Sequence, residues 1–373
     1  MRKTILPEQT IGILGGGQLG RMMAIAAKEM GYRIAVLEPT PNSPCAQVAD
    51  IEVVAPYDSK DGANELAKVS DVVTYEFENI SDETAKWLEE KAYLPQGSKL
   101  LAMTQDRKLE KQKINDSGIA TVPYHVVTTS DEINKGIQEL GFPAVLKTTR
   151  GGYDGKGQIV IRSDADIDSA RKLLEKNECV LEKWIAFEKE ISVIVTRSVT
   201  GETATFPVAE NIHVNNILHQ SIVPARISED TAEKAKQLAI QLADAFELVG
   251  TLAVEMFLTE AGTIYVNELA PRPHNSGHYT LDACETSQFE QHIRAICGWP
   301  LGRTALHTDV VMVNILGQHV EKTLASIGCF ETCKLHLYGK AEAKHNRKMG
   351  HLNVLANSVD EAFETINKLQ IWE

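Results

Sequence analysis

The chain has 373 residues, of which 43% are hydrophobic, and its formal net charge is −13. This length predicts two or three domains with sizeable cores. The negative charge argues against binding to duplex nucleic acid, and no apolar run reaches the roughly 18 residues of a membrane-spanning helix. The short apolar stretch near the N-terminus is not typical of a secretion signal, and six irregularly spaced cysteines without a CxxC pair indicate a reducing compartment. We therefore expect a cytoplasmic protein.

The first part of the chain alternates predicted strands and helices. Residues 10–17 (TIGILGGG) predict a buried strand that enters a glycine loop, residues 18–30 predict a helix, and residues 33–37 predict the next strand. This alternation predicts a doubly wound parallel sheet of the α/β class. The loop GGGQLG, with Glu38 at the end of the next strand, also fits a dinucleotide-binding fingerprint. An NAD-dependent oxidoreductase is therefore one alternative, although nothing later in the chain indicates hydride transfer.

The next part predicts a helix at residues 104–117, with Thr104 as its N-cap, and then a β-α-β-β-α-β segment up to about residue 182. Lys147 lies on the apolar strand PAVLKTT, where a buried ammonium is costly unless it meets an anion. The glycine-rich loop at residues 150–157 connects two predicted strands, and its exposed amides can fold over a polyphosphate. A flexible hairpin with a snorkelling lysine is the alternative.

Two acidic residues stand on a predicted hairpin, TLAVEMFLTEAGTIYVNEL. If Ala261 and Gly262 form a two-residue tip, Glu255 lies opposite Glu268 on one face of neighbouring strands. Opposed carboxylates repel each other unless a cation lies between them, so the pair predicts a Mg²⁺ site. A solvent-exposed sheet face is the alternative. Strand alternation turns Asn267 to the opposite face unless the strand bulges there.

Polar loops follow this hairpin. The segment APRPHNSGH offers Arg272 as an anion clamp and His274 as a base or a loop residue. Near the end of the chain, GKAEAKHNRKMGH places Lys340 and Arg347 in a basic cluster. Since the chain as a whole is acidic, this cluster favours phosphate binding, with a solvated loop as the alternative.

Together these motifs resemble the ATP-grasp superfamily, because the phosphate lysine, glycine hairpin, EKWI segment and paired acids occur in its order. The segments GGGQLGRM, RGGYDGKGQ, NELAPRPHNSGHYT and GK…NRKMGH narrow the resemblance to the N5-carboxyaminoimidazole ribonucleotide synthetase family, over essentially the whole chain. The resemblance implies an N-terminal pre-ATP-grasp domain at 1–103 and an ATP-grasp domain at 104–298, with a mobile subdomain at 120–185. A small C-terminal domain follows at 299–373.

The resemblance also implies a reaction. A ligase of this family forms a C–N bond by carboxylating 5-aminoimidazole ribonucleotide with bicarbonate and ATP, by way of carboxyphosphate. The products are N5-carboxyaminoimidazole ribonucleotide, ADP and phosphate, in a step of purine biosynthesis. The family implies Mg²⁺ as cofactor, with Mn²⁺ as a substitute, and a homodimer. Another ATP-grasp ligase that acts on a purine-pathway amine is the alternative.

The family's functional positions can be transferred residue by residue. The implied ATP contacts are Arg107, Lys147, Gly152, Tyr153, Asp154, Gly155, Lys156, Gly157, Gln158, Glu182, Lys183, Trp184, Ile185, Glu190, His213, Asn267 and Glu268. The implied metal ligands are Glu255 and Glu268. The implied contacts of the ribonucleotide and bicarbonate are Gln18, Glu76, Tyr153, Asp154, Arg272, His274, Lys340 and Arg347.

Three of these residues are expected to act in catalysis. The resemblance implies that Arg272 holds carboxyphosphate and that Asp154, on the glycine hairpin, orients the exocyclic amine. Lys340, together with Arg347, is expected to grip the ribose phosphate. The glycine loop GGGQLG then serves the substrate and not a dinucleotide.

Overall fold

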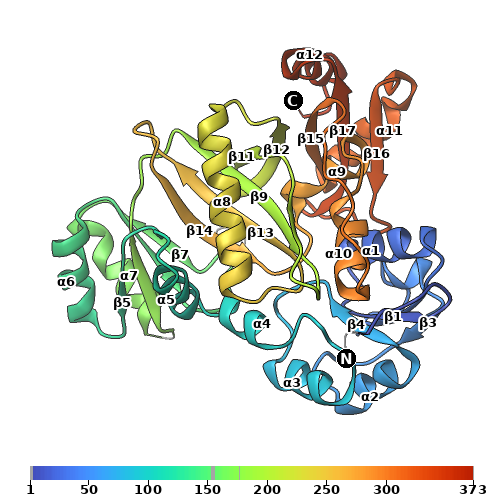
Figure 1. Cartoon of the computed structure of the whole chain (residues 1–373). Coiled ribbons are helices and arrows are strands. Elements are labelled where there is room, and N and C mark those ends of the chain that lie inside the picture. Colours follow the sequence, from blue (N-terminus) through green and yellow to red (C-terminus); the bar gives the residue numbers. More distant parts are fainter. Residues whose placement is uncertain (1–2, 153–155, 176, 373) are drawn as a thin grey trace.

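The computed structural model describes residues 3–152, 156–175 and 177–372. Within these residues the chain forms three β-sheets, flanked by helices (Figure 1). None of the described helices is long and apolar enough to cross a membrane. All six cysteines have free thiols, as the sequence predicts.

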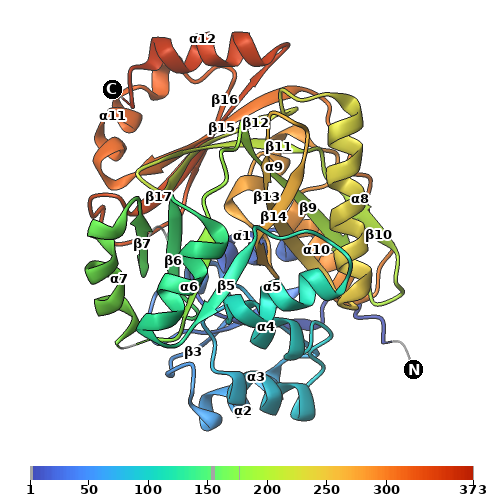
Figure 2. The ribbon, with the colours of Figure 1, turned by 90° about the vertical axis from the view of Figure 1, so that its left-hand side faces the viewer.

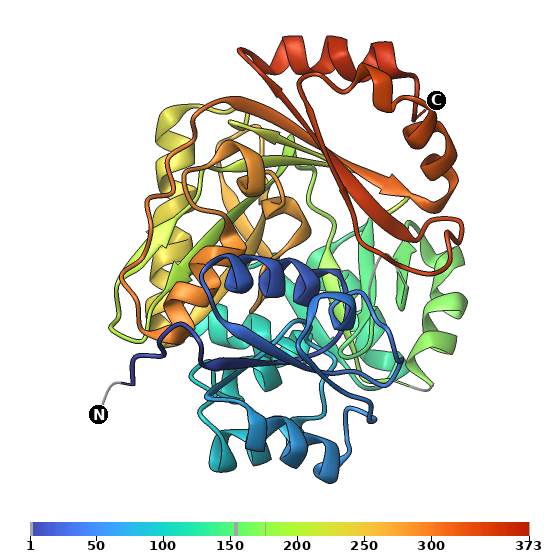
Figure 3. The same ribbon diagram turned by 90° about the vertical axis from the view of Figure 1, so that its right-hand side faces the viewer.

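The first sheet is parallel, with strand order β3-β2-β1-β4, which confirms the predicted doubly wound architecture. Helix α1 packs on one face, and α2 and α3 pack on the other (Figure 3), so the central strand β1 is buried along its whole length. Gly31, at a φ of 88°, follows the end of α1. The strands of this sheet and the helices of the same segment are β1 (Thr10–Leu14), α1 (Gln18–Glu29), β2 (Arg33–Leu37), β3 (Ile51–Val53), α2 (Lys60–Val69), β4 (Val72–Tyr75), α3 (Asp82–Lys91) and α4 (Lys99–Thr104).

The second sheet is antiparallel, with order β5-β8-β6-β7, and two helices cover one of its faces (Figure 2). Its β-α-β-β-α-β order agrees with the sequence prediction. Strands β6 and β7 flank the glycine hairpin. The elements are α5 (Arg107–Asp116), β5 (Tyr124–Val127), α6 (Ser130–Leu140), β6 (Ala144–Thr148), β7 (Gln158–Ile161), α7 (Ile167–Leu174) and β8 (Cys179–Lys183).

The third sheet has nine antiparallel strands and runs from the middle of the chain into its C-terminal part. Strand β12 pairs with β15, so the sheet is continuous across residue 299, where the sequence predicts a domain boundary. Strands β14 and β16 are its two edges. The strands are β9 (Lys189–Arg197), β10 (Thr203–Thr205), β11 (Ala209–Val214), β12 (Ile217–Val223), β13 (Gly250–Leu258), β14 (Ile264–Ala270), β15 (Asp309–Leu316), β16 (Cys333–Leu337) and β17 (Lys348–Ala356). The helices are α8 (Glu229–Ala245), α9 (Thr280–Ala283), α10 (Gln288–Cys297), α11 (Val320–Ala325) and α12 (Val359–Leu369).

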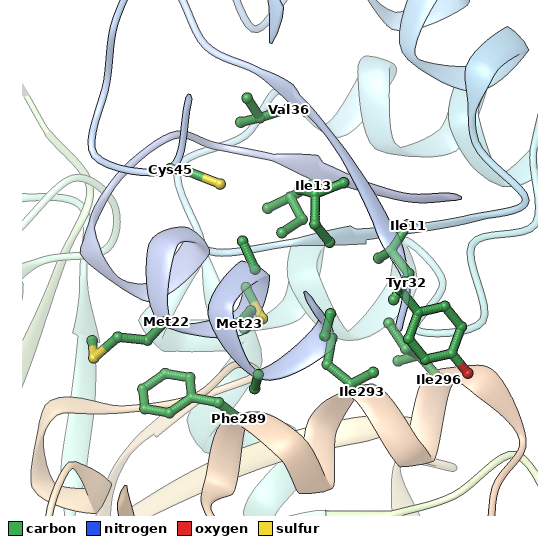
Figure 4. Packing of buried hydrophobic residues seen from close by; sticks show 14 of the residues in the cluster. Ile11, Ile13, Met22, Met23, Tyr32, Val36, Cys45, Phe289, Ile293 and Ile296 are labelled. Carbon is green, nitrogen blue, oxygen red and sulfur yellow. The ribbon is translucent and has the colours of Figure 1, made fainter. Parts of the chain in front are cut away.

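One core joins the N-terminal sheet to the rest of the molecule. Phe289 and Ile293 of α10 are fully buried against Met22 and Met23 of α1 (Figure 4). Burying such side chains contributes about 1.5–3 kcal/mol each. Helix α10 therefore holds the glycine loop at the start of α1 in a fixed place beside the large sheet.

Candidate active site

A cleft of about 740 Å³ lies between the small sheet and the nine-stranded sheet. It gathers most of the side chains that the sequence singled out. The predicted residues that line it are Arg107, Lys147, Lys156, Gln158, Glu182, Lys183, Trp184, Ile185, Glu190, His213, Glu255, Asn267, Glu268, Arg272 and His274. Gly152 and Gly157 lie at the base of the hairpin, and Tyr153, Asp154 and Gly155 lie outside the described residues.

Glu255 on β13 lies directly opposite Glu268 on β14, as predicted. The loop and the strand that produce this pairing differ from the predicted ones. The loop has three residues, because Thr263 N–H donates to Oγ1 of Thr259 and Thr259 N–H donates to the carbonyl of Thr263. The register also shifts next to Glu255, and Asn267 is the additional residue of a β-bulge. The bulge lets Asn267 and Glu268 both face the cleft.

The two carboxylates repel each other. Burial, and then the charge of Glu268, raise the pKa of Glu255 to about 7. Nε2 of His274 lies 3.2 Å from Oε1 of Glu255. Burial, followed by the nearby charge of Arg272, lowers the pKa of His274 well below its ordinary value, so the neutral imidazole contributes little compensating charge. This part of the cleft therefore favours a cation.

Arg107 connects this acidic pair to the glycine hairpin. Its guanidinium lies 3.4 Å from Oε2 of Glu268 and donates to the carbonyl of Gly152 at 3.2 Å. Helix α5 begins at Arg107, and its N-cap is Asp106, which accepts the N–H of Lys108 at 3.1 Å. The predicted N-cap, Thr104, is wrong: it ends the preceding helix α4 and bonds back to the carbonyl of Leu100.

Glu182 lies between two ammonium groups. Lys147 approaches it at 2.8 Å, as its position on a buried strand suggested, and Lys111 approaches the other oxygen at 3.0 Å. Burial disfavours the charged carboxylate, but the two lysines outweigh burial and lower the pKa of Glu182 to about 2. Sequence reasoning missed Lys111, because a lysine inside a polar helix carries no sign of burial.

Aromatic and basic side chains complete the other wall. Phe187 and Phe257 stack with ring centroids 4.7 Å apart. Nδ1 of His213 lies 2.7 Å from Oε2 of Glu190. Burial lowers the pKa of His213, but the contact with Glu190 outweighs burial and raises it overall. The arrangement provides a flat apolar surface, which suits a nucleobase, beside a carboxylate, which suits the hydroxyl groups of a ribose.

Arg272 is fixed by a partner that sequence reasoning missed. The carboxylate of Glu78 accepts hydrogen bonds from Nε of Arg272 at 2.5 Å and from Nη2 at 3.0 Å, which makes a bidentate ion pair. The charge of Arg272 outweighs burial and lowers the pKa of Glu78. The side chain is therefore held rigidly at the rim of the cleft, with Nη1 turned to the carbonyl of Pro273.

The glycine loop lies outside this cleft, and its backbone N–H groups donate to two carboxylates. Gly16 N–H donates to Glu38 at 2.8 Å, Gly20 N–H donates to Glu76 at 2.6 Å, and Gly17 N–H also donates to Glu76. These are the amides that a dinucleotide pyrophosphate would require. Glu38, the acid that a dinucleotide-binding fingerprint would place at the ribose, accepts one of these N–H groups instead. The loop geometry therefore opposes the oxidoreductase alternative.

Four predicted substrate residues, Gln18, Glu76, Lys340 and Arg347, do not line the cleft. Lys340 donates to the carbonyl of Lys348, a cleft residue, at 2.7 Å. Burial, followed by the charge of Arg347, lowers the pKa of Lys340 to about 8. The charge of Glu76 acts on both Lys340 and Arg272, so these groups share one electrostatic environment.

Comparisons with known proteins agree with this geometry. Residues 112–289 match the model of the ATP-grasp domain, 8–105 match the ribonucleotide synthetase preATP-grasp domain, and 310–365 match the phosphoribosylaminoimidazole carboxylase C-terminal domain. The N5-carboxyaminoimidazole ribonucleotide synthase of Bacillus subtilis is 55% identical over 98% of this chain and 96% of its own.

Solved structures show the same similarity. An ADP complex of an N5-carboxyaminoimidazole ribonucleotide synthetase is 64% identical, covers 100% of this chain and 99% of its own, and superposes with a TM-score of 0.98. The Aspergillus clavatus synthase, in complex with ADP and 5-aminoimidazole ribonucleotide, is 31% identical over 98% of both chains, with a TM-score of 0.91.

The fold, with its cleft between two sheets, defines an ATP-grasp enzyme. It is a ligase that forms a C–N bond. Within this class, the chain belongs to the N5-carboxyaminoimidazole ribonucleotide synthase family.

Proposed function

We propose that this cleft performs the reaction of the family, with bicarbonate as the source of the carboxyl group. ATP phosphorylates bicarbonate to carboxyphosphate, and the amine of 5-aminoimidazole ribonucleotide attacks it. The products are N5-carboxyaminoimidazole ribonucleotide, ADP and phosphate, within purine biosynthesis. The observation that carries the proposal is the pairing of Glu255 with Glu268 in the same cleft as Lys147.

The adenosine of ATP is assigned to the wall formed by β8 and the following segment. Trp184, Phe187 and Phe257 supply apolar surface, and Glu190 is the carboxylate that can accept from ribose hydroxyls. Lys147 and Lys156 face the phosphate side, where a cation neutralises developing charge. Tyr153, Asp154 and Gly155 keep their proposed roles on the hairpin.

The Glu255–Glu268 pair fits a divalent cation. Burial, followed by the charge of Glu268, raises the pKa of Glu255, and a cation between the two carboxylates would offset both effects. Among the described residues no group of three or more His, Cys, Asp or Glu side chains forms a complete metal site, and Mg²⁺ in phosphate sites is held by one or two carboxylates, phosphate oxygens and water. Mg²⁺, or Mn²⁺ in its place, would neutralise charge on the β- and γ-phosphates when bound. Asn267 adds a neutral oxygen beside Glu268.

The ribonucleotide is assigned to the side where the segment between β16 and β17 contacts the N-terminal domain, at the hydrogen bond from Gln47 to the carbonyl of Gly339. Arg272, held by Glu78, is the proposed clamp for carboxyphosphate, with His274 beside it. Lys340 and Arg347 are the proposed phosphate ligands. Gln18, at the start of α1, and Glu76, directly after β4, are the proposed contacts from the N-terminal domain. These parts mainly position reactants and stabilise charge, which is what phosphoryl transfer requires.

A coupled assay for ADP tests the proposal. We expect ADP release to require the divalent ion, 5-aminoimidazole ribonucleotide and added bicarbonate in carbonate-depleted buffer. A panel of other purine-pathway amines serves as the control for a different ATP-grasp ligase. ADP release at full rate without bicarbonate, or with another amine alone, contradicts the proposal.

A homodimer in the cytoplasm completes the proposed function. Strand β16 is an open edge of the large sheet, and Leu324, Ile327 and Leu337 are 48%, 51% and 40% exposed near it. Exposed apolar side chains beside an unpaired edge favour association. Sedimentation equilibrium tests the dimer, and a monomer at all accessible concentrations contradicts it.

A further inference from the structure

Strand β14, which carries the proposed metal ligand Glu268, is an edge of the nine-stranded sheet. In a regular edge strand the outward-pointing N–H groups belong to alternate residues. Here the outward N–H groups that donate hydrogen bonds belong to Val266 and Leu269, and these residues are three positions apart. The additional position is the bulge at Asn267. The bulge therefore depends on the acceptor of the Leu269 N–H, which follows it in the strand.

The N–H of Val266 donates to the carbonyl of Ala120 at 3.0 Å, in a bridge outside the sheet. The N–H of Leu269 donates to Oε1 of Glu110 at 2.7 Å. Glu110 lies on α5 and is 1% exposed, so water does not replace it easily. A buried N–H without an acceptor carries a desolvation penalty that would favour another register.

We propose that Glu110 is a positioning residue for the metal end of the cleft, because its carboxylate fixes the bulge that turns Asn267 and Glu268 toward the ligand. This inference rests on the proposed metal role of Glu268. Without the bonded amide, β14 can relax toward regular alternation, which turns Asn267 or Glu268 away from the cleft.

The position of Glu110 on α5 supports this role. It lies one helical turn after Arg107, whose guanidinium approaches Glu268, so one helix face contacts both Glu268 and Leu269, the two residues that follow Asn267. Burial, followed by the charge of Glu268, raises the pKa of Glu110 to about 8. A neutral acid still accepts through its carbonyl oxygen, so the hydrogen bond does not require the charge. Glutamine is therefore a faithful replacement.

The test compares two variants of similar length. Glu110→Gln keeps an oxygen for the Leu269 amide, and Glu110→Met removes it. Each variant is assayed for the Mn²⁺ concentration that gives half-maximal ADP release, for KM of the ribonucleotide, and for Mn²⁺ binding to the ADP complex by electron paramagnetic resonance. The matched control is Glu89→Met, since Glu89 accepts the N–H of Ser98 at 3.0 Å in the N-terminal domain.

We expect Glu110→Met to weaken Mn²⁺ binding by about 10-fold or more, as for other residues that orient metal ligands. Its KM for the ribonucleotide stays near the wild-type value, and Glu110→Gln and Glu89→Met bind Mn²⁺ as the wild type does. A purely structural role would lower stability and leave Mn²⁺ binding in the folded fraction unchanged. If Glu110→Met does not fold, Glu110→Asp replaces it, because the shorter side chain cannot reach Leu269.

Two results overturn the inference: a folded Glu110→Met enzyme with wild-type Mn²⁺ binding, or a Glu110→Gln enzyme as weak as Glu110→Met. Glu268→Gln, measured in parallel, separates this failure from that of the proposed function. If Glu268→Gln loses Mn²⁺ and Glu110→Met does not, only the positioning role is wrong. If Glu268→Gln also keeps wild-type Mn²⁺ binding, the metal assignment itself is wrong.

Discussion

The Nζ atom of Lys111 lies 3.0 Å from Oε1 of Glu182, and the two side chains are 1% and 4% exposed. Lys111 belongs to α5 and Glu182 to β8, so this buried ion pair fixes the helix to the small sheet. Lys147 contacts the other carboxylate oxygen. Glu182 therefore holds Lys147 in position for its proposed contact with a nucleotide phosphate.

Lys111→Met tests this ion pair. Removing one partner of a buried pair lowers the free energy of unfolding by about 3–5 kcal/mol when the remaining charge has no other partner. Glu182 keeps Lys147, so we expect a loss below this range but above that of an exposed pair. Urea denaturation at pH 7 measures the loss. Lys108→Met is the control on the same helix, since its ion pair with Glu178 is exposed and contributes at most about 1 kcal/mol. Equal losses in the two variants would contradict the assignment.

The sign of the pH dependence follows from the lowered pKa of Glu182. Its stabilising effect is complete above the ordinary carboxyl value of 4.5 and is lost as the pH falls toward about 2. The stability difference between wild type and Lys111→Met is therefore expected to narrow below pH 4.5. A difference that stays constant down to pH 2.5 would show that the charge of Glu182 is not responsible.

Glu268→Gln tests the acidic pair directly. The substitution preserves shape but removes the charge that a divalent cation requires. We expect kcat to fall by more than about 100-fold, since even residues behind metal ligands cost about 10–100-fold. Far-ultraviolet circular dichroism checks that the fold is retained. Glu260→Gln, at the tip of the same hairpin, is the control, and normal turnover by Glu268→Gln would refute the metal role.

The pairing of Glu255 with Glu268 could be predicted from the sequence, although its details could not. Strand alternation and the short turn place the two acids opposite each other. The prediction used a two-residue tip and a regular strand, whereas the structure has a three-residue loop and a bulge at Asn267. These two one-residue differences cancel at Glu268. Bulges depend on contacts from outside the hairpin, here from α5, and hairpin periodicity contains no record of them.

The missed residues share one physical reason. Glu110 and Glu78 bond to partners 159 and 194 positions away in sequence, so neither spacing nor periodicity brings them together. Both look like ordinary surface acids in the sequence. Lys111 likewise lies in a helix whose polar composition hides its buried face. By contrast, Lys147 could be identified because a single charge interrupts an apolar strand.

Glu78→Gln tests how far Arg272 depends on its partner. The two hydrogen bonds to Glu78 hold the guanidinium in one orientation, and the amide of glutamine cannot accept both. We expect kcat to fall about 10- to 100-fold with little change in KM for ATP, because misplacing a positioning group mainly affects the transition state. Glu285→Gln, which disrupts the exposed pair with Arg303, is the control. A larger effect on KM for ATP than on kcat would contradict this role.

Arg347→Ala tests the proposed phosphate grip. Arg347 is exposed and bonds only to a backbone carbonyl among the contacts described, so its removal leaves the core intact. We expect KM for the ribonucleotide to rise far more than KM for ATP. Lys344→Ala, in the same basic segment, is the control for a general change of surface charge. Equal rises in both KM values would argue against a phosphate contact.

The lowered pKa of Lys340 predicts a pH limit on the same substrate. Burial and the charge of Arg347 bring this pKa from 10.5 to about 8, so the ammonium that would bind phosphate is present below pH 8 and lost above it. The plot of kcat/KM for the ribonucleotide should therefore fall above pH 8, while the plot for ATP does not. Arg347→Ala removes one of the charges that depress the pKa, so its falling limb should move to higher pH, and Lys340→Met should abolish the limb. A limb that persists in Lys340→Met would assign the titration to another group.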